Sequence, residues 1–199
     1  MTADDGSDVD GRWRAPHCET NWEATYQRGQ WDYLDGIGEV PRYAVLAGYV
    51  HKLLDRGAVL DAGCGEAILA RYLDLGRFTY DGIDVSPTAI ERARTRVRAR
   101  TLTAAAIETF APPAETLYAA VVFGDSLQHM ATPLESVDRY RAFLRPDGFV
   151  IISLYAGGNG PRLGRLFADA CGDGRYTLVD RAKAVSISHG LEWDILVVR

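Results

Sequence analysis

The sequence predicts a doubly wound α/β fold, in which a mostly parallel sheet lies between two layers of helices. Short apolar runs alternate about five times with stretches that have the periodicity of amphipathic helices. Pro87, Pro133 and Pro161 stand at the expected first turns of three of these helices, where the missing amide hydrogen costs nothing. Repeated units of strand and helix build parallel sheets that are covered on both faces.

The expected strands and helices follow one another without an internal repeat. A helix is expected from Pro41 to Gly57, and further helical patterns follow the first, second, fourth and fifth expected strands. The last two expected strands have no helical spacing between them, so the chain closes on a pair of strands. The expected strands are 58–63, 78–86, 102–107, 117–126, 149–155, 176–181 and 193–199.

Composition excludes several classes of protein. The chain has 199 residues, 47% of them hydrophobic and 25% charged, with a formal net charge of −5, which fits one soluble domain without bulk affinity for nucleic acid. No apolar run approaches the roughly 18 residues of a membrane span, and residues 1–11 lack the apolar core of a signal peptide, so a cytoplasmic location is expected. The three cysteines are scattered, which disfavours both a disulfide framework and a metal site.

The chain divides into three expected segments. Residues 1–12 are acidic and without apolar periodicity, as in a disordered tail. Residues 13–56 hold a large share of the aromatic side chains and are expected to form a helical cap. Residues 57–199 contain the strand and helix units, and we expect them to form the ligand-binding domain.

A glycine turn follows the first expected strand, at the place where open α/β sheets bind ligands. Gly63 and Gly65 allow the backbone to turn tightly and to approach a ligand closely. Asp84 ends the next strand about 20 residues further on, a position from which a carboxylate reaches ribose hydroxyls. A nucleotide-like ligand with a free ribose is therefore expected.

Charge in the turn argues against a dinucleotide. Asp61 and Glu66 would repel a pyrophosphate, and Ile68 stands where a dinucleotide fingerprint requires a third glycine. Carboxylates suit a ligand that carries an ammonium group. The sequence thus favours an aminoacyl nucleoside without phosphates and disfavours an oxidoreductase that uses NAD.

Four sequence segments carry a resemblance to a known family. VLDAGCGEA, GIDVS, AAVVFGDSLQHM and LRPDGFVIISLY resemble the class I S-adenosylmethionine-dependent methyltransferases, over residues 41–199. The resemblance implies a Rossmann-like seven-stranded sheet with an antiparallel last strand, S-adenosyl-L-methionine as cofactor, and a methyltransferase domain at 57–199. Ala67, Ala106 and Ala119 or Ala120 stand where the family often has a glycine, an aspartate and an acid, respectively.

The same resemblance assigns cofactor contacts. It implies that Asp61, Gly63 and Gly65 line the methionine half of the cofactor, that Asp84 holds the ribose, and that Ile107 contacts the adenine. The aromatic segment would fold over the cofactor, with rings suited to a sulfonium. The expected cofactor-binding residues are Tyr26, Trp31, Arg42, Asp61, Gly63, Gly65, Asp84, Val85, Ile107, Glu108 and Gly124.

The segment after the fourth strand offers candidates for catalysis. His129 is the expected general base because its ordinary pKa lies near neutrality, although packing alone would also explain a histidine there. Asp125 would orient His129, bind substrate or contact the cofactor. Tyr33, Ser126 and Tyr155 are the expected acceptor-binding residues.

These residues predict methylation of a small molecule such as a natural product, a sugar or a metabolite. Oxygen is favoured as the methylated atom because His129 and Asp125 would together activate a hydroxyl. N-methylation of a small amine and a catalytically inactive binding protein of the same fold remain as alternatives. The expected partners are a small-molecule acceptor and no nucleic acid or membrane, with the chain a monomer or a homodimer.

Overall fold

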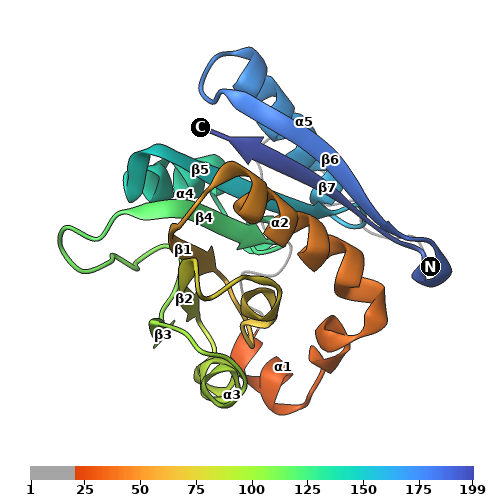
Figure 1. The fold of residues 1–199 in the computed structure, drawn as a ribbon. Helices are drawn as coiled ribbons and strands as arrows, with labels where there is room; N and C mark the ends of the chain where they lie inside the picture. Colours follow the sequence, from red (N-terminus) through yellow and green to blue (C-terminus); the bar gives the residue numbers. More distant parts are fainter. Residues whose placement is uncertain (1–20) are drawn as a thin grey trace.

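Seven strands form one sheet in the order β3-β2-β1-β4-β5-β7-β6 (Figure 1). Strand β7 runs antiparallel to both of its neighbours, β5 and β6, whereas the other pairings are parallel. This confirms the predicted doubly wound fold with an antiparallel last strand. The strands are β1 (Gly57–Ala62), β2 (Phe78–Asp84), β3 (Thr101–Ala104), β4 (Tyr118–Gly124), β5 (Leu144–Tyr155), β6 (Leu178–Ser186) and β7 (Leu191–Val198).

The computed structural model describes residues 21–199. The predicted tail at 1–12 and the first part of the predicted cap, 13–20, lie outside the described residues. The α-helices are α1 (Trp22–Gln27), α2 (Val40–Leu53), α3 (Pro87–Arg96), α4 (Pro133–Arg141) and α5 (Gly160–Gly172). Residues 21–199 also form five short 3-10 helices, which are η1 (Asp32–Asp35), η2 (Ile37–Glu39), η3 (Ile68–Tyr72), η4 (Leu127–His129) and η5 (Ile187–His189).

Two apolar cores lie on opposite faces of the sheet, as the alternation of side chains along a strand requires. Along β1, Val59 belongs to the core under α2, η3 and α3, whereas Leu60 belongs to the core under α4 and α5. Figure 1 shows α2 crossing one face of the sheet. The three layers fix the strand ends, and with them the turns that carry polar side chains.

The segment after β1 differs from the expected amphipathic α-helix, because only the 3-10 helix η3 forms there. Ala67 precedes η3 in the left-handed conformation, with φ of 57°, and Leu73 follows it in an extended conformation. These two residues leave a single short turn between them. Ile68 and Leu69 still fill the core, so the apolar pattern reflects burial rather than a full α-helix.

The strand order reverses between β1 and β4, so the chain leaves these strands in opposite directions. Open α/β sheets bind ligands in the crevice that this reversal creates at the carboxyl ends of the strands. Here the crevice is bordered by the residues after Ala62, Asp84 and Gly124. None of the helices within residues 21–199 is long and apolar enough to cross a membrane.

Candidate active site

A cavity of about 690 Å³ opens at the carboxyl ends of β1, β2, β4 and β5, beneath α1 and η1. Its size is in the range of known ligand sites. Every site residue expected from the sequence lines it: Tyr26, Trp31, Tyr33, Arg42, Asp61, Gly63, Gly65, Asp84, Val85, Ile107, Glu108, Gly124, Asp125, Ser126, His129 and Tyr155. The structure therefore brings all of these candidates to one place.

The glycine turn after β1 has the geometry that only glycine adopts easily. Gly63 and Gly65 have φ of 81° and 54°. A Cβ atom at Gly63 would lie 2.6 Å from Cβ of Ser126, and one at Gly65 would lie 2.6 Å from the hydroxyl of Tyr26. A side chain at either position would therefore clash with its neighbours. With glycine at both positions, the backbone of the turn lines the cavity.

Asp84 fixes this turn from the end of β2. Its Oδ2 accepts a hydrogen bond from the amide of Gly65 at 2.9 Å, and its Oδ1 accepts one from the amide of Ser86 at 2.9 Å. Burial raises the pKa of Asp84, whereas the two amides lower it. Asp84 thus joins the glycine turn to the start of α3 while its carboxylate lines the cavity.

Asp61 contributes a second buried carboxylate. Its Oδ2 accepts a hydrogen bond from the hydroxyl of Tyr80 at 2.7 Å. Burial raises the pKa of Asp61 to about 7, although Tyr80 and Arg42 both act to lower it. A ligand with a positive charge would stabilise the ionised form of this carboxylate.

The charge of Glu66 is compensated, which the sequence did not indicate. Its carboxylate pairs with Arg92, at 2.9 Å, and with Arg96, both on α3. Arg92 and Arg96 thus form ion pairs with a carboxylate of the same domain. Asp61 and Asp84, rather than Glu66, supply the negative charge at the glycine turn.

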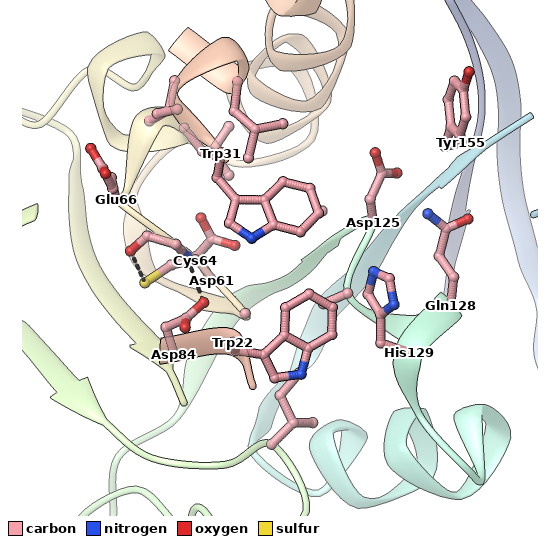
Figure 2. A pocket seen from close by; sticks show the side chains of 18 of the residues that line it. Trp22, Trp31, Asp61, Cys64, Glu66, Asp84, Asp125, Gln128, His129 and Tyr155 are labelled. Carbon is pink, nitrogen blue, oxygen red and sulfur yellow. Dashed lines mark hydrogen bonds between the residues drawn. The ribbon is translucent and has the colours of Figure 1, made fainter. Parts of the chain in front are cut away.

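Aromatic rings cover the cavity. The rings of Trp22 and Trp31 stack with centroids 5.9 Å apart, and the Trp31 ring also lies 6.4 Å from Tyr26 and 5.8 Å from Tyr33. Figure 2 shows Trp22 and Trp31 in the middle of the site, between Asp61 and Asp84 on one side and Asp125 and His129 on the other. The two tryptophan rings thus lie between the carboxylates at the glycine turn and the side chains that follow β4 (Figure 2).

Glu23 anchors this aromatic layer to the rest of the domain. Its carboxylate accepts hydrogen bonds from the hydroxyl of Ser86, at 2.6 Å, and from the amide and hydroxyl of Thr88. These bonds, led by that from Ser86, lower the pKa of Glu23 to about 2. Helix α1 is thereby docked at the start of α3, next to Asp84.

Asp125 is held by residues from three elements. Its Oδ2 accepts hydrogen bonds from Nη1 of Arg42 at 2.5 Å and from Nε1 of Trp193 at 2.9 Å, and its Oδ1 accepts one from Ser153 at 2.6 Å. Its φ of 62° is unusual for a residue other than glycine. A strained backbone conformation of this kind persists only where surrounding contacts hold the residue in place. For Asp125 these contacts come from α2, β5 and β7.

Arg42 lies between two carboxylates. Besides its bond to Asp125, its Nη2 lies 2.9 Å from Oε2 of Glu39 and donates to the hydroxyl of Tyr43 at 2.8 Å. Its guanidinium carbon lies 5.6 Å from the centre of the Trp193 ring. Arg42, one of the expected cofactor-binding residues, is thus buried among groups of the protein.

His129 lines the cavity at the end of η4. Its ring meets the Trp22 ring edge-on, with centroids 4.7 Å apart. The neighbouring Gln128 also lines the cavity, and within residues 21–199 its Oε1 is buried without a hydrogen-bond partner. Both are placed beside Asp125 (Figure 2).

The other expected residues have simpler surroundings. Ser126 donates a hydrogen bond to the carbonyl of Ala62 at 2.6 Å, and the carbonyl of Ile107 accepts one from Tyr140 at 3.0 Å. Glu108 is exposed at the rim. Val85, Gly124 and Tyr155 line the cavity.

The lining residues that the sequence did not single out as site candidates include Trp22, Glu39, Gln128 and Trp193. Trp22 belongs to the aromatic segment and Gln128 to the segment after β4, so both had a signal in the sequence. Glu39 and Trp193 had none, because only the tertiary fold brings η2 and β7 to the cavity. Across the described part of the chain, His, Cys, Asp and Glu side chains form no group able to hold a metal ion.

The groups around the glycine turn fit S-adenosylmethionine. Gly63 and Gly65 leave room that a Cβ atom would close, and Asp84 lines the cavity with a carboxylate of the kind expected to bind a ribose. Asp61 offers negative charge to a cationic, phosphate-free ligand. The expected cofactor is therefore compatible with this half of the cavity.

Comparison with known proteins identifies the family. A family model described as a methyltransferase domain matches residues 40–184. The chain belongs to this family. The match confirms the expected S-adenosylmethionine-dependent methyltransferase and its cofactor, S-adenosyl-L-methionine.

Solved structures share the fold of this methyltransferase. The N-methyltransferase NodS from Bradyrhizobium japonicum WM9, in complex with S-adenosyl-L-homocysteine, superposes with a TM-score of 0.75 at 19% identity, covering 90% of this chain and 98% of that one. The 1,6-didemethyltoxoflavin-N1-methyltransferase of Burkholderia thailandensis, with bound 1,6-didemethyltoxoflavin and S-adenosylhomocysteine, gives 0.71 at 21% identity, covering 97% and 93%.

A third structure extends the comparison to another acceptor. Magnesium protoporphyrin IX methyltransferase ChlM from Synechocystis PCC 6803, with bound S-adenosylhomocysteine, gives a TM-score of 0.67 at 15% identity, covering 88% of this chain and 94% of that one. No curated protein sequence matches this chain. At these identities the structures establish the shared fold.

Proposed function

We propose that this methyltransferase transfers the methyl group of S-adenosylmethionine to a nitrogen atom of a small molecule. The single observation that carries the choice of nitrogen over oxygen is the bonding of Asp125. Its carboxylate accepts hydrogen bonds from Arg42, Trp193 and Ser153. The charge of Arg42 offsets that of Asp125, so Asp125 does little to strengthen His129 as a base.

This arrangement weakens the argument for O-methylation that the sequence suggested. A hydroxyl of high pKa needs a strong base before it attacks, whereas a neutral amine is already nucleophilic. The fold similarity to NodS and to the 1,6-didemethyltoxoflavin-N1-methyltransferase, both described as methylating nitrogen, supports the same choice. Methylation of nitrogen is therefore the function that the site supports best.

Alignment and exclusion of water are the main tasks left to the protein. When bound, S-adenosylmethionine supplies a methyl group that its positive sulfur already activates. Asp84 and the glycine turn would orient the cofactor, and the rings of Trp22 and Trp31 would keep water from the reacting atoms. The imidazole of His129 would receive the proton that the acceptor nitrogen gives up.

The size of the cavity supports a small acceptor. About 690 Å³ must accommodate the cofactor and the acceptor together, beneath the aromatic layer. A folded macromolecule would have to present one extended group through the same opening. A small amine or nitrogen heterocycle fits more readily.

Transfer of a labelled methyl group tests the proposal. The protein would be incubated with S-adenosylmethionine carrying a deuterated methyl group and with matched pairs of aromatic amines and alcohols, and the products would be analysed by mass spectrometry. We expect the label on nitrogen. Label on oxygen alone would refute the proposal, and calorimetry with S-adenosylhomocysteine would show independently that the cofactor site is intact.

A further inference from the structure

Glu39 is a buried carboxylate that lines the cavity and shares its ion-pair partner, Arg42, with Asp125. Only 4% of its surface is exposed. Its Oε2 lies 2.9 Å from Nη2 of Arg42, but within residues 21–199 no group donates a hydrogen bond of acceptable angle to this oxygen. A buried oxygen in this state is costly unless a ligand completes its bonding.

The charges around Glu39 do not balance. Arg42 is the shared partner of Glu39 and Asp125, and its hydrogen bond, at 2.5 Å, goes to Asp125. With both carboxylates ionised, this group of three residues carries one net negative charge. Burial raises the pKa of Glu39 although Arg42 acts to lower it, as expected for a charge that is incompletely compensated.

Aromatic rings surround this charge. Tyr33 and Tyr155 line the same part of the cavity, and the Tyr155 and Trp193 rings lie 6.2 Å apart. Tyr33 is near enough to Glu39, Asp125 and Tyr155 for their charges to raise its pKa, next to the larger effect of burial. A carboxylate among ring faces is suited to an organic cation.

We propose that Glu39 recognises a positively charged group of the acceptor, an organic ammonium next to an aromatic or apolar body and distinct from the neutral nitrogen that takes the methyl group. The inference rests on the proposed function, because it places the acceptor in this half of the cavity. The ammonium would donate a hydrogen bond to Oε2 of Glu39. Its apolar body would lie against Tyr33 and Tyr155.

Binding of three small probes to the protein saturated with S-adenosylhomocysteine tests this assignment. The probes are 2-phenylethylamine, 2-phenylethanol and 3-phenylpropanoate, which share an aromatic body and differ in charge. We expect calorimetry to detect the amine, and to show binding at least tenfold weaker in Glu39→Gln, since a charge-assisted hydrogen bond is lost. The exposed residue Glu135, changed by Glu135→Gln, is the matched control and should bind the amine as the wild type does.

The outcomes separate recognition from structural support. If Glu39 serves only as a counterion of Arg42, Glu39→Gln will lower the melting temperature of the unliganded protein or leave the binding of the amine unchanged, and either result overturns the proposal. Absence of amine binding to the wild type, or equal binding of 3-phenylpropanoate, overturns it too. Label found only on oxygen in the methyl-transfer assay would instead refute N-methylation, while the preference for a cation would still stand on the binding data.

Discussion

The two halves of the cavity are built in different ways. The half proposed for the cofactor consists of a glycine turn and a carboxylate from adjacent strands, β1 and β2, tied together by the amide of Gly65 and the side chain of Asp84. The half proposed for the acceptor is formed by side chains from α1, η2, α2, η4, β5 and β7, of which those from α2, β5 and β7 bind Asp125. The first depends on backbone geometry, and the second depends on tertiary packing.

This difference has a physical consequence. Backbone geometry near a glycine is determined locally, so the cofactor half tolerates few substitutions at its glycines and carboxylates. In the acceptor half each side chain is placed by its own element, so single substitutions there change recognition without disturbing the cofactor. Effects on cofactor and acceptor should therefore separate by residue.

The largest effect is expected in the cofactor half, from Asp84→Ala. The substitution removes the carboxylate aimed at the ribose and also the bonds to the amides of Gly65 and Ser86. We expect binding of S-adenosylhomocysteine to weaken by roughly a hundredfold or more, because charge-assisted bonds are lost on both sides. Calorimetry measures this directly, and binding within a few-fold of the wild type would disprove the role of Asp84.

The next largest effect is expected in the acceptor half, from His129→Ala. Loss of the group that takes up the proton should lower kcat by about thirtyfold, less than is typical of general-base catalysis because a neutral amine attacks unaided, while the affinity for S-adenosylhomocysteine stays within twofold. The control is His51→Ala, since His51 lies on α2 and accepts a hydrogen bond from the amide of Asp74 outside the cavity. If kcat is unchanged, His129 has no role in proton transfer and serves only to pack against Trp22.

The substitution Gly65→Ala tests whether cofactor binding depends on the backbone geometry of the glycine turn. In Gly65→Ala the new Cβ would lie 2.6 Å from the Tyr26 hydroxyl, at a φ of 54°. We expect binding of S-adenosylhomocysteine to weaken by about tenfold, since even 1.4 kcal/mol of strain has this effect. Gly174→Ala is the matched control, because Gly174 also has a positive φ, of 78°, does not line the cavity, and a Cβ there meets nothing within 4 Å.

A double variant distinguishes the clash from the effect of φ. Removing the hydroxyl in Gly65→Ala with Tyr26→Phe should recover part of the binding lost in Gly65→Ala. If the double variant binds no better than the single one, contact with Tyr26 is not what constrains the turn. Loss of binding in Gly174→Ala would show that the effect of Gly65→Ala is not specific to the turn beside the cavity.

The smallest expected effect is a dependence on pH from Asp61. Its pKa of about 7 means that a cationic ligand, which favours the ionised form, must displace a proton at lower pH. We expect the affinity for S-adenosylhomocysteine to fall by about tenfold from pH 8 to pH 6 in the wild type. Calorimetry at several pH values should show a weaker, nearly flat dependence in Asp61→Asn.

The same residue predicts the stability of the unliganded protein. Because folding raises the pKa of Asp61, its contribution to stability decreases as pH rises from the unfolded value near 4 to about 7. Asp61→Asn should therefore melt at a higher temperature than the wild type at pH 8, with a smaller difference at pH 5. An equal difference at both values would show that ionisation of Asp61 is not responsible.

The sequence predicted most of the fold and which residues around the glycine turn line the cavity, because both depend on local patterns. Apolar alternation located the strands, and the spacing from Gly63 to Asp84 indicated the edge of the sheet where the cavity lies. The pattern did not distinguish the 3-10 helix η3 from an α-helix, since the left-handed conformation of Ala67 is not encoded by apolar spacing.

The acceptor half was predicted only where its residues follow a strand or belong to the aromatic segment. His129 and Tyr155 follow strands, and Tyr33 belongs to that segment. Glu39 and Trp193 reach the cavity through the packing of η2 and β7, and the commitment of Asp125 to Arg42 depends on the position of α2. Such contacts join residues far apart in the chain and have no local signature.

The division of the cavity is tested most directly by titrating two ligands into two variants under the same conditions. We predict that Asp84→Ala loses S-adenosylhomocysteine, whereas Glu39→Gln binds it within twofold of the wild type. Glu39→Gln, saturated with S-adenosylhomocysteine, should then lose at least tenfold in affinity for 2-phenylethylamine. If Glu39→Gln weakens both ligands equally, or weakens neither, the cavity is not divided as described.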